Sequence, residues 1–318
     1  MSNDTDVLII GAGQCGLSLS NRLRARHIDH RAVEANSAPG DVWRRRWDSL
    51  RLFTPSRYDG LPGLPFPGAS RYRPSAGEFA DYLDAYAEHI DFPASYGETV
   101  TSASPDPAGG FTVHTATSSG PRVRRSRRLV VATGGHTAPT VPADATALDS
   151  RIAQLHTDDY HRPDDLPGDR VLVVGCGASG LQLAVELARA GRTVTVAGRP
   201  TPSIPAPALA IAGGLWFAFL HQVLTRRTPM GRKAAPKAIG SGAPLIGISA
   251  TDLERHGVRR VSRFDGAVDG VPRIADGGLI DVDAALWATG YRPAPPLLAD
   301  RLAEGSSGPD SPGPDGRS

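Results

Sequence analysis

The sequence is poor in cysteine and has no long apolar run, and its charges nearly balance. Among 318 residues only Cys15 and Cys176 are cysteines, which excludes a disulfide scaffold, a Cys-x-x-Cys redox pair and a cysteine zinc site. The 35 basic and 33 acidic side chains leave a formal charge of +2, which argues against a nucleic-acid or polybasic membrane binder. The most apolar run, residues 211–224, is too short to span a bilayer. Because residues 1–6 lack a signal-peptide pattern, we expect a cytoplasmic protein.

The length of the chain favours two domains, since one domain takes about 100–200 residues. Two strand–helix–strand patterns stand out, each with an apolar first strand typical of a parallel sheet. The first pattern predicts strands at 6–10 and 31–34 around a helix at 14–26. The second predicts strands at 171–174 and 193–197 around a helix at 179–190. The fold class is therefore α/β.

These two patterns form an internal repeat, because residues 7–35 align without a gap with residues 171–199. Each copy carries Gly-x-Gly-x-x-Gly between its first strand and its helix, the context that indicates a dinucleotide-binding turn. Its first glycine permits the tight turn, its second lets the backbone approach a pyrophosphate, and its third lets helix and strand pack closely. These glycines are Gly11, Gly13 and Gly16 in the first copy and Gly175, Gly177 and Gly180 in the second.

The two copies differ where the second strand ends, and that difference predicts different nucleotides. Glu34 ends the first copy, and a carboxylate there accepts from ribose hydroxyls and repels a 2′-phosphate, which suits FAD or NAD. Gly198 and Arg199 end the second copy, where a guanidinium favours a 2′-phosphate. We therefore assign FAD to the first copy and NADPH to the second. The alternative is that Arg199 is merely a solvated arginine.

Other segments are less regular. Ser75 and Glu78, and Thr251 and Glu254, have the spacing of helix capping boxes. Strands near 98–103, 110–115 and 122–131 predict a small antiparallel unit at about 97–131. A further short strand is expected at 267–274, and the last at 284–288. Residues from 304 onward contain no large apolar side chain, and we expect them to be disordered.

Six segments in order resemble the flavin-containing monooxygenases, with the bacterial members and the plant auxin-forming branch most similar. They are GAGQCG at 11–16, GDVWRRRW at 40–47, LPFP at 64–67, VVATGG at 130–135, VLVVGCGASG at 171–180 and WATGYRP at 287–293. The resemblance implies two Rossmann-like domains, with the NADPH domain inserted in the FAD domain. It implies an FAD-binding part at 1–155, an NADPH-binding domain at 156–275, an incomplete return to the FAD domain at 276–300 and a tail at 301–318.

The resemblance also implies the chemistry. NADPH reduces FAD, dioxygen adds to the reduced flavin, and the flavin hydroperoxide delivers one oxygen atom to a small organic substrate. The cofactors carry this reaction, so we assign no catalytic side chain and no metal. The cofactor-binding residues that we expect are Gly11, Gly13, Gln14, Gly16, Glu34, Trp43, Arg44, Thr133, Gly134, Gly175, Gly177, Ser179, Gly180, Arg199, Thr289 and Gly290. For Trp43 and Arg44 the equally weighted alternative is packing and a solvated basic face.

The chain departs from the family pattern at several places. The linker signature Phe-x-Gly-x-x-x-His-x-x-x-Tyr keeps His156 and Tyr160 but has Ser150 and Ile152 at its start. Ala178 replaces a common Asn, and the chain ends soon after Pro296. Two alternatives therefore stay open: an NAD(P)H-dependent flavoprotein reductase, and a truncated nucleotide-binding protein without turnover. A disulfide reductase that uses a cysteine pair is excluded. No nucleic-acid or integral membrane partner is expected, and a homodimer is left open.

Overall fold

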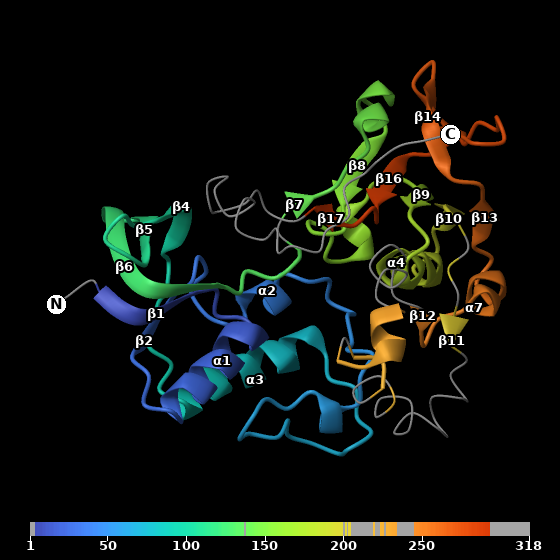
Figure 1. Ribbon diagram of the computed structural model, residues 1–318. Coiled ribbons are helices and arrows are strands. Elements are labelled where there is room, and N and C mark those ends of the chain that lie inside the picture. Colours follow the sequence, from blue (N-terminus) through green and yellow to red (C-terminus); the bar gives the residue numbers. More distant parts are fainter. Residues whose placement is uncertain are drawn as a thin grey trace. The chain divides into compact units, whose positions relative to one another are not determined.

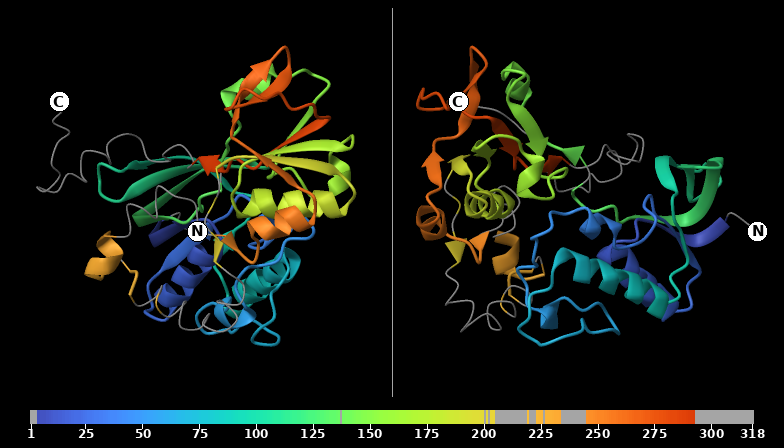
Figure 2. Two further views of the ribbon diagram at one scale, coloured as in Figure 1. Left: turned by 90° about the vertical axis from the view of Figure 1, so that its right-hand side faces the viewer. Right: turned by 180° about the vertical axis from the view of Figure 1, so that it is seen from behind.

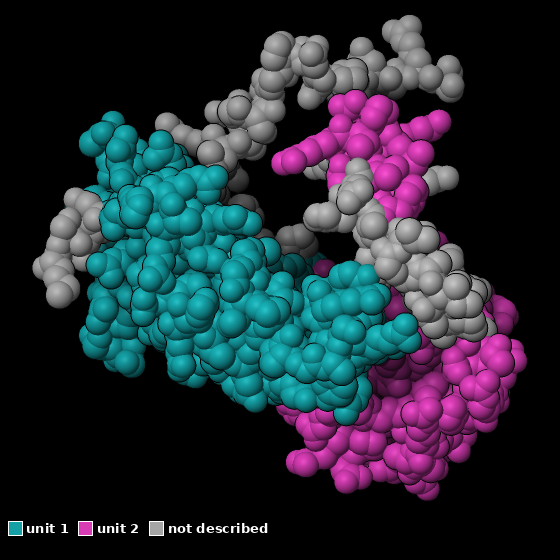
Figure 3. All heavy atoms as spheres, turned by 90° about the horizontal axis from the view of Figure 1, so that it is seen from below, with its two compact units in different colours: residues 1–45, 50–138, 292–318 teal, residues 46–49, 139–291 magenta. Residues whose placement is uncertain are grey.

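The computed structural model describes residues 4–136, 138–199, 201, 203–204, 219, 223–225, 227–233 and 245–292. Most of the apolar run at 211–224 and the tail from 293 onward, including the expected return to the first domain beyond Arg292, lie outside these residues. The chain divides into two compact units (Figure 3). Unit 1 contains the described residues of 1–45 and 50–138 together with Arg292, and unit 2 contains 46–49 and 139–291.

Unit 1 is built on one mixed sheet with the strand order β3-β2-β1-β6-β5-β4 (Figure 1). Strands β3, β2, β1 and β6 are parallel, and β6, β5 and β4 are antiparallel. The strand bounds are β1 Asp4–Ile10, β2 His30–Val33, β3 Ala94–Ser95, β4 Thr99–Pro105, β5 Phe111–Thr117 and β6 Gly120–Val131. The antiparallel unit that the sequence predicts is thus continuous with the parallel sheet, because the twelve-residue β6 pairs with β5 at one end and with β1 at the other.

Two longer helices accompany this sheet, α1 (Gln14–Arg24) and α3 (Ala76–His89). The capping box that the sequence predicts for α3 is confirmed: Glu78 N–H donates to Ser75 Oγ (3.2 Å), and Ser75 N–H donates to Glu78 Oε2 (2.8 Å). Leu17 of α1 packs with Leu83 and Tyr86 of α3 in a buried cluster. Between β2 and α3 the chain forms the short helix α2 (Asp41–Arg44) and the 3₁₀ turn η1 (Ser56–Tyr58).

Unit 2 contains a five-stranded parallel sheet with the order β13-β10-β9-β16-β8. Its strands are β8 Ala153–His156, β9 Arg170–Val174, β10 Thr193–Ala197, β13 Arg259–Val261 and β16 Ala284–Trp287. Both βαβ repeats are therefore formed, with α4 (Ala178–Arg189) joining β9 to β10. The family resemblance predicts a return to the first domain at 276–300, whereas β16, which lies in that range, is placed between β9 and β8. Its four residues are all buried there, as an inner parallel strand requires.

Both faces of this second sheet are covered. Helices α4 and α7 (Ala250–Arg255) lie side by side (Figure 2), and Leu172, Val174 and Trp287 belong to a second cluster of buried side chains. The helix α7 begins differently from the prediction, because Ser249 and Asp252 form its capping box and Thr251 is exposed.

Several short elements complete the two units. The expected strand at 267–274 is a hairpin, β14 (Phe264–Val268) and β15 (Val271–Ile274), because Asp269 and Gly270 both take positive φ angles, 49° and 81°. The remaining elements are β7 Ala138–Pro139, β11 Ser203–Ile204, β12 Leu245–Ile246, β17 Tyr291–Arg292, η2 Ala143–Ala147 and η3 Pro163–Asp165.

Candidate functional site

The first glycine turn joins β1 to α1 and is fixed by close backbone contacts. Gly11 has φ +108°, and its N–H donates to Val33 O (2.9 Å). A Cβ on Gly11 would lie 2.6 Å from Ala132 O, and one on Gly16 would lie 2.1 Å from Gly11 O. No side chain fits at either position, so these two glycines are required by the fold itself.

Gly13 has a different environment, because a Cβ there would meet nothing within 4 Å. It is the N-cap of α1, with no side-chain cap and no acidic residue in the first helical turn. Gln14 and Cys15, which begin the helix, are exposed. The free N–H groups and the positive end of the helix dipole therefore face open space, which is the arrangement that binds phosphate.

The second glycine turn, between β9 and α4, repeats this geometry. Gly175 has φ +121°, and its Cβ would lie 2.3 Å from Ala288 O. The Cβ of Gly180 would lie 2.1 Å from Gly175 O, while that of Gly177 would meet nothing within 4 Å. Gly177 is again an N-cap without a side-chain cap, and Ser179 lies half-buried in the first helical turn. Both turns thus offer an open helix N-terminus.

The repeat extends to a third segment in each unit, which the sequence analysis did not align. Ala-Thr-Gly follows β6 at 132–134 and β16 at 288–290. Ala132 N–H donates to Ile10 O and Ala288 N–H to Val174 O, each at 2.8 Å. Gly134 and Gly290 have φ angles of +77° and +79°. The recurrence of Ala-Thr-Gly was the signal that could have revealed this equivalence.

Thr133, Gly134, Thr289 and Gly290 thus share their surroundings with a glycine turn, because the preceding alanine carbonyl lies against the first glycine of each turn. Thr289 is held further, since its Oγ1 donates to Thr140 O. These four predicted residues are therefore placed at the carboxyl ends of strands adjacent to β1 and β9. Ligands of α/β sheets bind at that edge.

Glu34 follows β2, and its carboxylate reaches back to the first glycine turn. Glu34 Oε2 accepts from Ala12 N–H (2.7 Å), and Oε1 accepts from the backbone N–H (2.9 Å) and the side-chain amide (2.5 Å) of Asn36. Arg45 donates in turn to Asn36 Oδ1 (2.7 Å). Burial, Asp84 and Glu34 raise the pKa of Tyr96 to about 12. Asn36 and Tyr96 were not predicted, although Asn36 is only two residues from Glu34.

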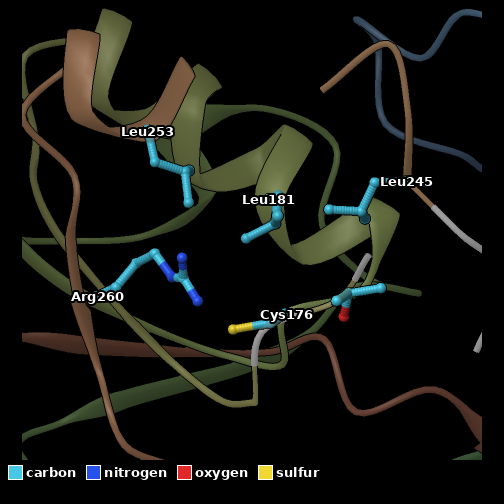
Figure 4. Close-up of a pocket in the computed structure, with 6 residues that line it drawn as sticks. Cys176, Leu181, Leu245, Leu253 and Arg260 are labelled. Carbon is cyan, nitrogen blue, oxygen red and sulfur yellow. The ribbon is translucent and has the colours of Figure 1, made fainter. Parts of the chain in front are cut away.

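The corresponding position in the second unit cannot hold a carboxylate side chain without rearrangement. A Cβ on Gly198 would lie 2.7 Å from Cys176 Sγ and 3.0 Å from Cys176 N. Cys176 occupies the place of Ala12, and its larger side chain points between α4 and β13 toward Arg260 and Leu181 (Figure 4). Burial raises the pKa of this thiol. The absence of an acid at 198 therefore follows from packing as well as from sequence.

A pocket of about 640 Å³ lies beside the second glycine turn, within the range of roughly 300–1,000 Å³ that is common for ligand sites. Gly175 and Gly177 line it together with Arg199, Arg263 and Thr289. Arg199 is exposed, and no carboxylate pairs with it within the described part of the chain. The pocket joins the turn, the Ala-Thr-Gly segment and a free guanidinium in one unit.

Trp43 and Arg44 make contacts that favour the packing alternative. The Trp43 ring packs edge-to-face on Phe79, with centroids 4.9 Å apart. Arg44 pairs with Asp81 (2.7 Å) and Asp84 (2.6 Å), and the hydrogen bonds that its guanidinium donates to these carboxylates raise its pKa. Their predicted contact with a flavin stays a prediction.

His156 holds the second Ala-Thr-Gly segment. Its Nε2 lies 3.1 Å from Gly290 O, and Asp158 N–H donates to its Nδ1 (3.1 Å). Because a carbonyl only accepts, these contacts assign the ring proton to Nε2. Burial lowers the His156 pKa, so the ring is neutral at pH 7. Tyr160 is also fully buried and donates to Glu186 Oε1 (3.1 Å), which gives both linker residues structural roles.

No helix in the described ranges is long and apolar enough to cross a membrane. Among the same residues, no three His, Cys, Asp or Glu side chains are grouped so that they could hold a metal ion. Trp216 and Phe217 of the apolar run at 211–224 lie outside the described residues, and Phe219 of the same run is exposed.

Comparisons with known proteins agree with this geometry. Residues 8–208 match the family model described as pyridine nucleotide-disulphide oxidoreductase. An uncharacterized CzcO-like oxidoreductase of Geobacillus kaustophilus is 31% identical, over 92% of this chain and 82% of that protein. The indole-3-pyruvate monooxygenase YUCCA1 of Oryza sativa is 31% identical, over 90% of this chain and 76% of that protein.

One solved structure is similar both in fold and in sequence. A double mutant of a flavin monooxygenase from Stenotrophomonas maltophilia has a TM-score of 0.71 and 26% identity, over 92% of this chain and 80% of that chain. The resemblance to flavin-containing monooxygenases that the motifs indicated is confirmed.

Proposed function

Because the chain belongs to the pyridine nucleotide-disulphide oxidoreductase family, we propose that it is an FAD- and NADPH-dependent monooxygenase that transfers one atom of dioxygen to a small organic substrate. That it is an oxidoreductase of the flavin-monooxygenase type follows from its relatives. One observation carries the finer proposal. The two open glycine turns have equivalent geometry, but the side chains beside them carry opposite charges: the Glu34 carboxylate in the first unit and the free Arg199 guanidinium in the second.

The residues of the first unit fit FAD. The open N-terminus of α1 suits a diphosphate, and Gly13 leaves room for it because a Cβ would project into that space. Glu34 lies within hydrogen-bond distance of the same turn, where its carboxylate can accept from ribose hydroxyls. We propose Gly11, Gly13, Gln14, Gly16, Glu34, Thr133 and Gly134 as the FAD-binding residues.

The residues of the second unit fit NADPH. Gly175, Gly177, Ser179, Gly180, Thr289 and Gly290 form the turn and its neighbouring segment, and Arg199 supplies a cation beside it. We therefore infer that the two units are Rossmann-like dinucleotide-binding domains, the second inserted in the first. When bound, NADPH supplies the reducing equivalents and the flavin supplies the reaction with dioxygen. The side chains bind and orient these groups and exclude water.

A reductase that passes electrons to another acceptor is the second candidate, since the same pair of sites would serve it. Purified protein distinguishes the two. We expect a flavin absorbance spectrum, NADPH oxidation that depends on dioxygen, and a product heavier by one oxygen atom in a mass-spectrometric substrate panel. Incorporation of ¹⁸O from labelled dioxygen identifies the oxygenase. NADPH oxidation sustained by a quinone under argon, with no oxygenated product in air, would favour the reductase. Protein that cannot be reconstituted with FAD would contradict both.

A further inference from the structure

We propose that Arg263, a residue the sequence analysis did not single out, forms with Arg199 a two-guanidinium clamp for the 2′-phosphate of NADPH. The inference rests on the proposed function and names a second residue that determines the specificity of its NADPH site. Four observations carry it: strand register, backbone anchoring, the state of the neighbouring charges, and a shared pocket.

Strand register brings the two arginines together although 64 residues separate them in sequence. Strands β10 and β13 are parallel neighbours, with Ala197 paired to Val261 as their last residues. Arg199 and Arg263 each stand two residues beyond that pair. Because neighbouring strands lie about 4.8 Å apart, two long side chains that leave the same edge at equivalent places can converge on one phosphate.

Backbone hydrogen bonds fix both positions. Gly198 N–H donates to Val261 O (3.4 Å), which ties the segment after β10 to β13. Ala275 N–H donates to Arg263 O (2.9 Å), which anchors the segment after β13 to the β14–β15 hairpin. The backbone of Arg263 and that of the residue before Arg199 are thus tied to neighbouring segments of the same unit.

The charges around Arg263 leave its guanidinium available. Arg263 is exposed, and no ion pair engages it among the residues that the structure describes. Two carboxylates also line the pocket, Asp144 and Asp265. Asp265 is paired with Arg273 (3.4 Å), which also donates to the Asp265 carbonyl (2.9 Å). Of these two carboxylates, only Asp144 has no ion-pair partner among the described residues. The pocket therefore contains one unpaired carboxylate and two unpaired guanidinium groups.

The same pocket holds the glycine turn and both arginines. A dinucleotide whose diphosphate lies at Gly177 would extend its adenosine toward the end of β10, as the position of the acid in such folds requires. A phosphomonoester carries close to two negative charges at pH 7, and guanidinium groups bind it by paired, charge-assisted hydrogen bonds. Two guanidinium groups match that charge better than Arg199 alone.

The test is direct binding, measured by isothermal titration calorimetry on the purified full chain with NADP⁺, NAD⁺ and 2′,5′-ADP as probes. For Arg263→Ala we expect the Kd for NADP⁺ and 2′,5′-ADP to rise at least tenfold, with the Kd for NAD⁺ changed less than twofold. Arg263→Lys should recover only part of the affinity, because lysine keeps the positive charge but lacks the paired donors of the planar guanidinium. Arg259→Ala is the matched control: Arg259 is exposed on β13, the strand that precedes Arg263, but does not line the pocket.

The double variant with Arg199→Ala sharpens the test. If both guanidinium groups bind one phosphate, the two losses will not add, since contacting residues show coupling in a double-mutant cycle. Equal weakening of NADP⁺ and NAD⁺ by Arg263→Ala would assign Arg263 to the diphosphate and overturn the inference. Unchanged NADP⁺ binding would overturn it as well. Both outcomes leave the proposed function standing if Arg199→Ala abolishes the preference for NADP⁺. Wild-type protein that binds NADP⁺ no better than NAD⁺ would contradict the NADPH assignment itself, and the clamp with it.

Discussion

The packing between Cys176 and Gly198 predicts how the cofactor preference of the second unit can be reversed. In the first unit the equivalent residues are Ala12 and Glu34, and Ala12 N–H donates to the Glu34 carboxylate (2.7 Å). In the second, a Cβ at position 198 would lie 2.7 Å from Cys176 Sγ. The double variant Cys176→Ala/Gly198→Glu therefore rebuilds the arrangement of the first unit, whereas Gly198→Glu alone forces a side chain against a buried thiol.

The contact sets the size of the expected effects. Overpacking a filled site costs about 1–3 kcal/mol, so Gly198→Glu alone should lower the Tm of the second unit by roughly 2–12 °C, given about 2–4 °C for each kcal/mol in a domain of about 150–250 residues. Removing the sulfur in the double variant should recover part of that loss, because the contact of the new Cβ with the backbone nitrogen of residue 176 (3.0 Å) remains. A carboxylate hydrogen bond to a ribose hydroxyl contributes about 1.5–3 kcal/mol, which corresponds to roughly a 10- to 150-fold gain in affinity for NAD⁺ relative to NADP⁺.

Two measurements check this reasoning, the melting temperature of each variant and the calorimetric Kd for NAD⁺ and NADP⁺. Cys176→Ala is the matched control and should leave the preference for NADP⁺ unchanged. A single Gly198→Glu variant as stable as the wild type would show that the thiol contact is not limiting. A stable double variant that still prefers NADP⁺ would refute the assignment of the end of β10 to the adenosine ribose.

Three further predictions concern the glycine turn, a buried histidine and a buried ion pair. Gly13→Ala should leave Tm unchanged but weaken flavin retention, because its Cβ meets no protein atom, whereas Gly16→Ala should lower Tm because its Cβ would lie 2.1 Å from a carbonyl oxygen. Melting curves and the flavin absorbance of the purified variants check both predictions. Equal Tm losses in the two variants would contradict the distinction between the two glycines. Burial lowers the folded-state pKa of His156, so the unfolded chain binds more protons than the folded chain as the pH falls below about 6.5, and the free energy of unfolding should fall with the pH. His156→Gln should flatten that part of the pH profile in denaturant titrations. An unaltered profile would exclude His156 as its source. Arg124→Ala should cost about 3–5 kcal/mol, because the buried Glu98 carboxylate loses its near ion pair at 2.6 Å and keeps only the longer one to Arg122 at 4.0 Å. A loss below 1 kcal/mol in urea titration would show that the Arg124–Glu98 pair is dispensable.

Local structure could be predicted from the sequence where a short stretch of residues specifies its own geometry. The glycine spacings predicted both turns, and Ser75 with Glu78 predicted the start of α3. The same kind of reasoning went wrong at α7, where Ser249 and Asp252 form the capping box two residues before the expected one. The Asp269–Gly270 turn was also missed, although this dipeptide between apolar residues is a hairpin signal and both residues take positive φ.

The sequence by itself determined the two βαβ repeats and the opposite chemistry at their ends, because a glycine turn and the helix that follows it depend on residues close together in the chain. Only the tertiary structure decided which distant residues meet there. The register of β10 with β13 brings Arg263 beside Arg199, β16 enters the second sheet between β9 and β8, and Cys176 occupies the space that a side chain at 198 would need. Strand pairing and side-chain packing join segments separated by tens of residues, and such pairings leave no local periodicity by which the sequence alone could show them.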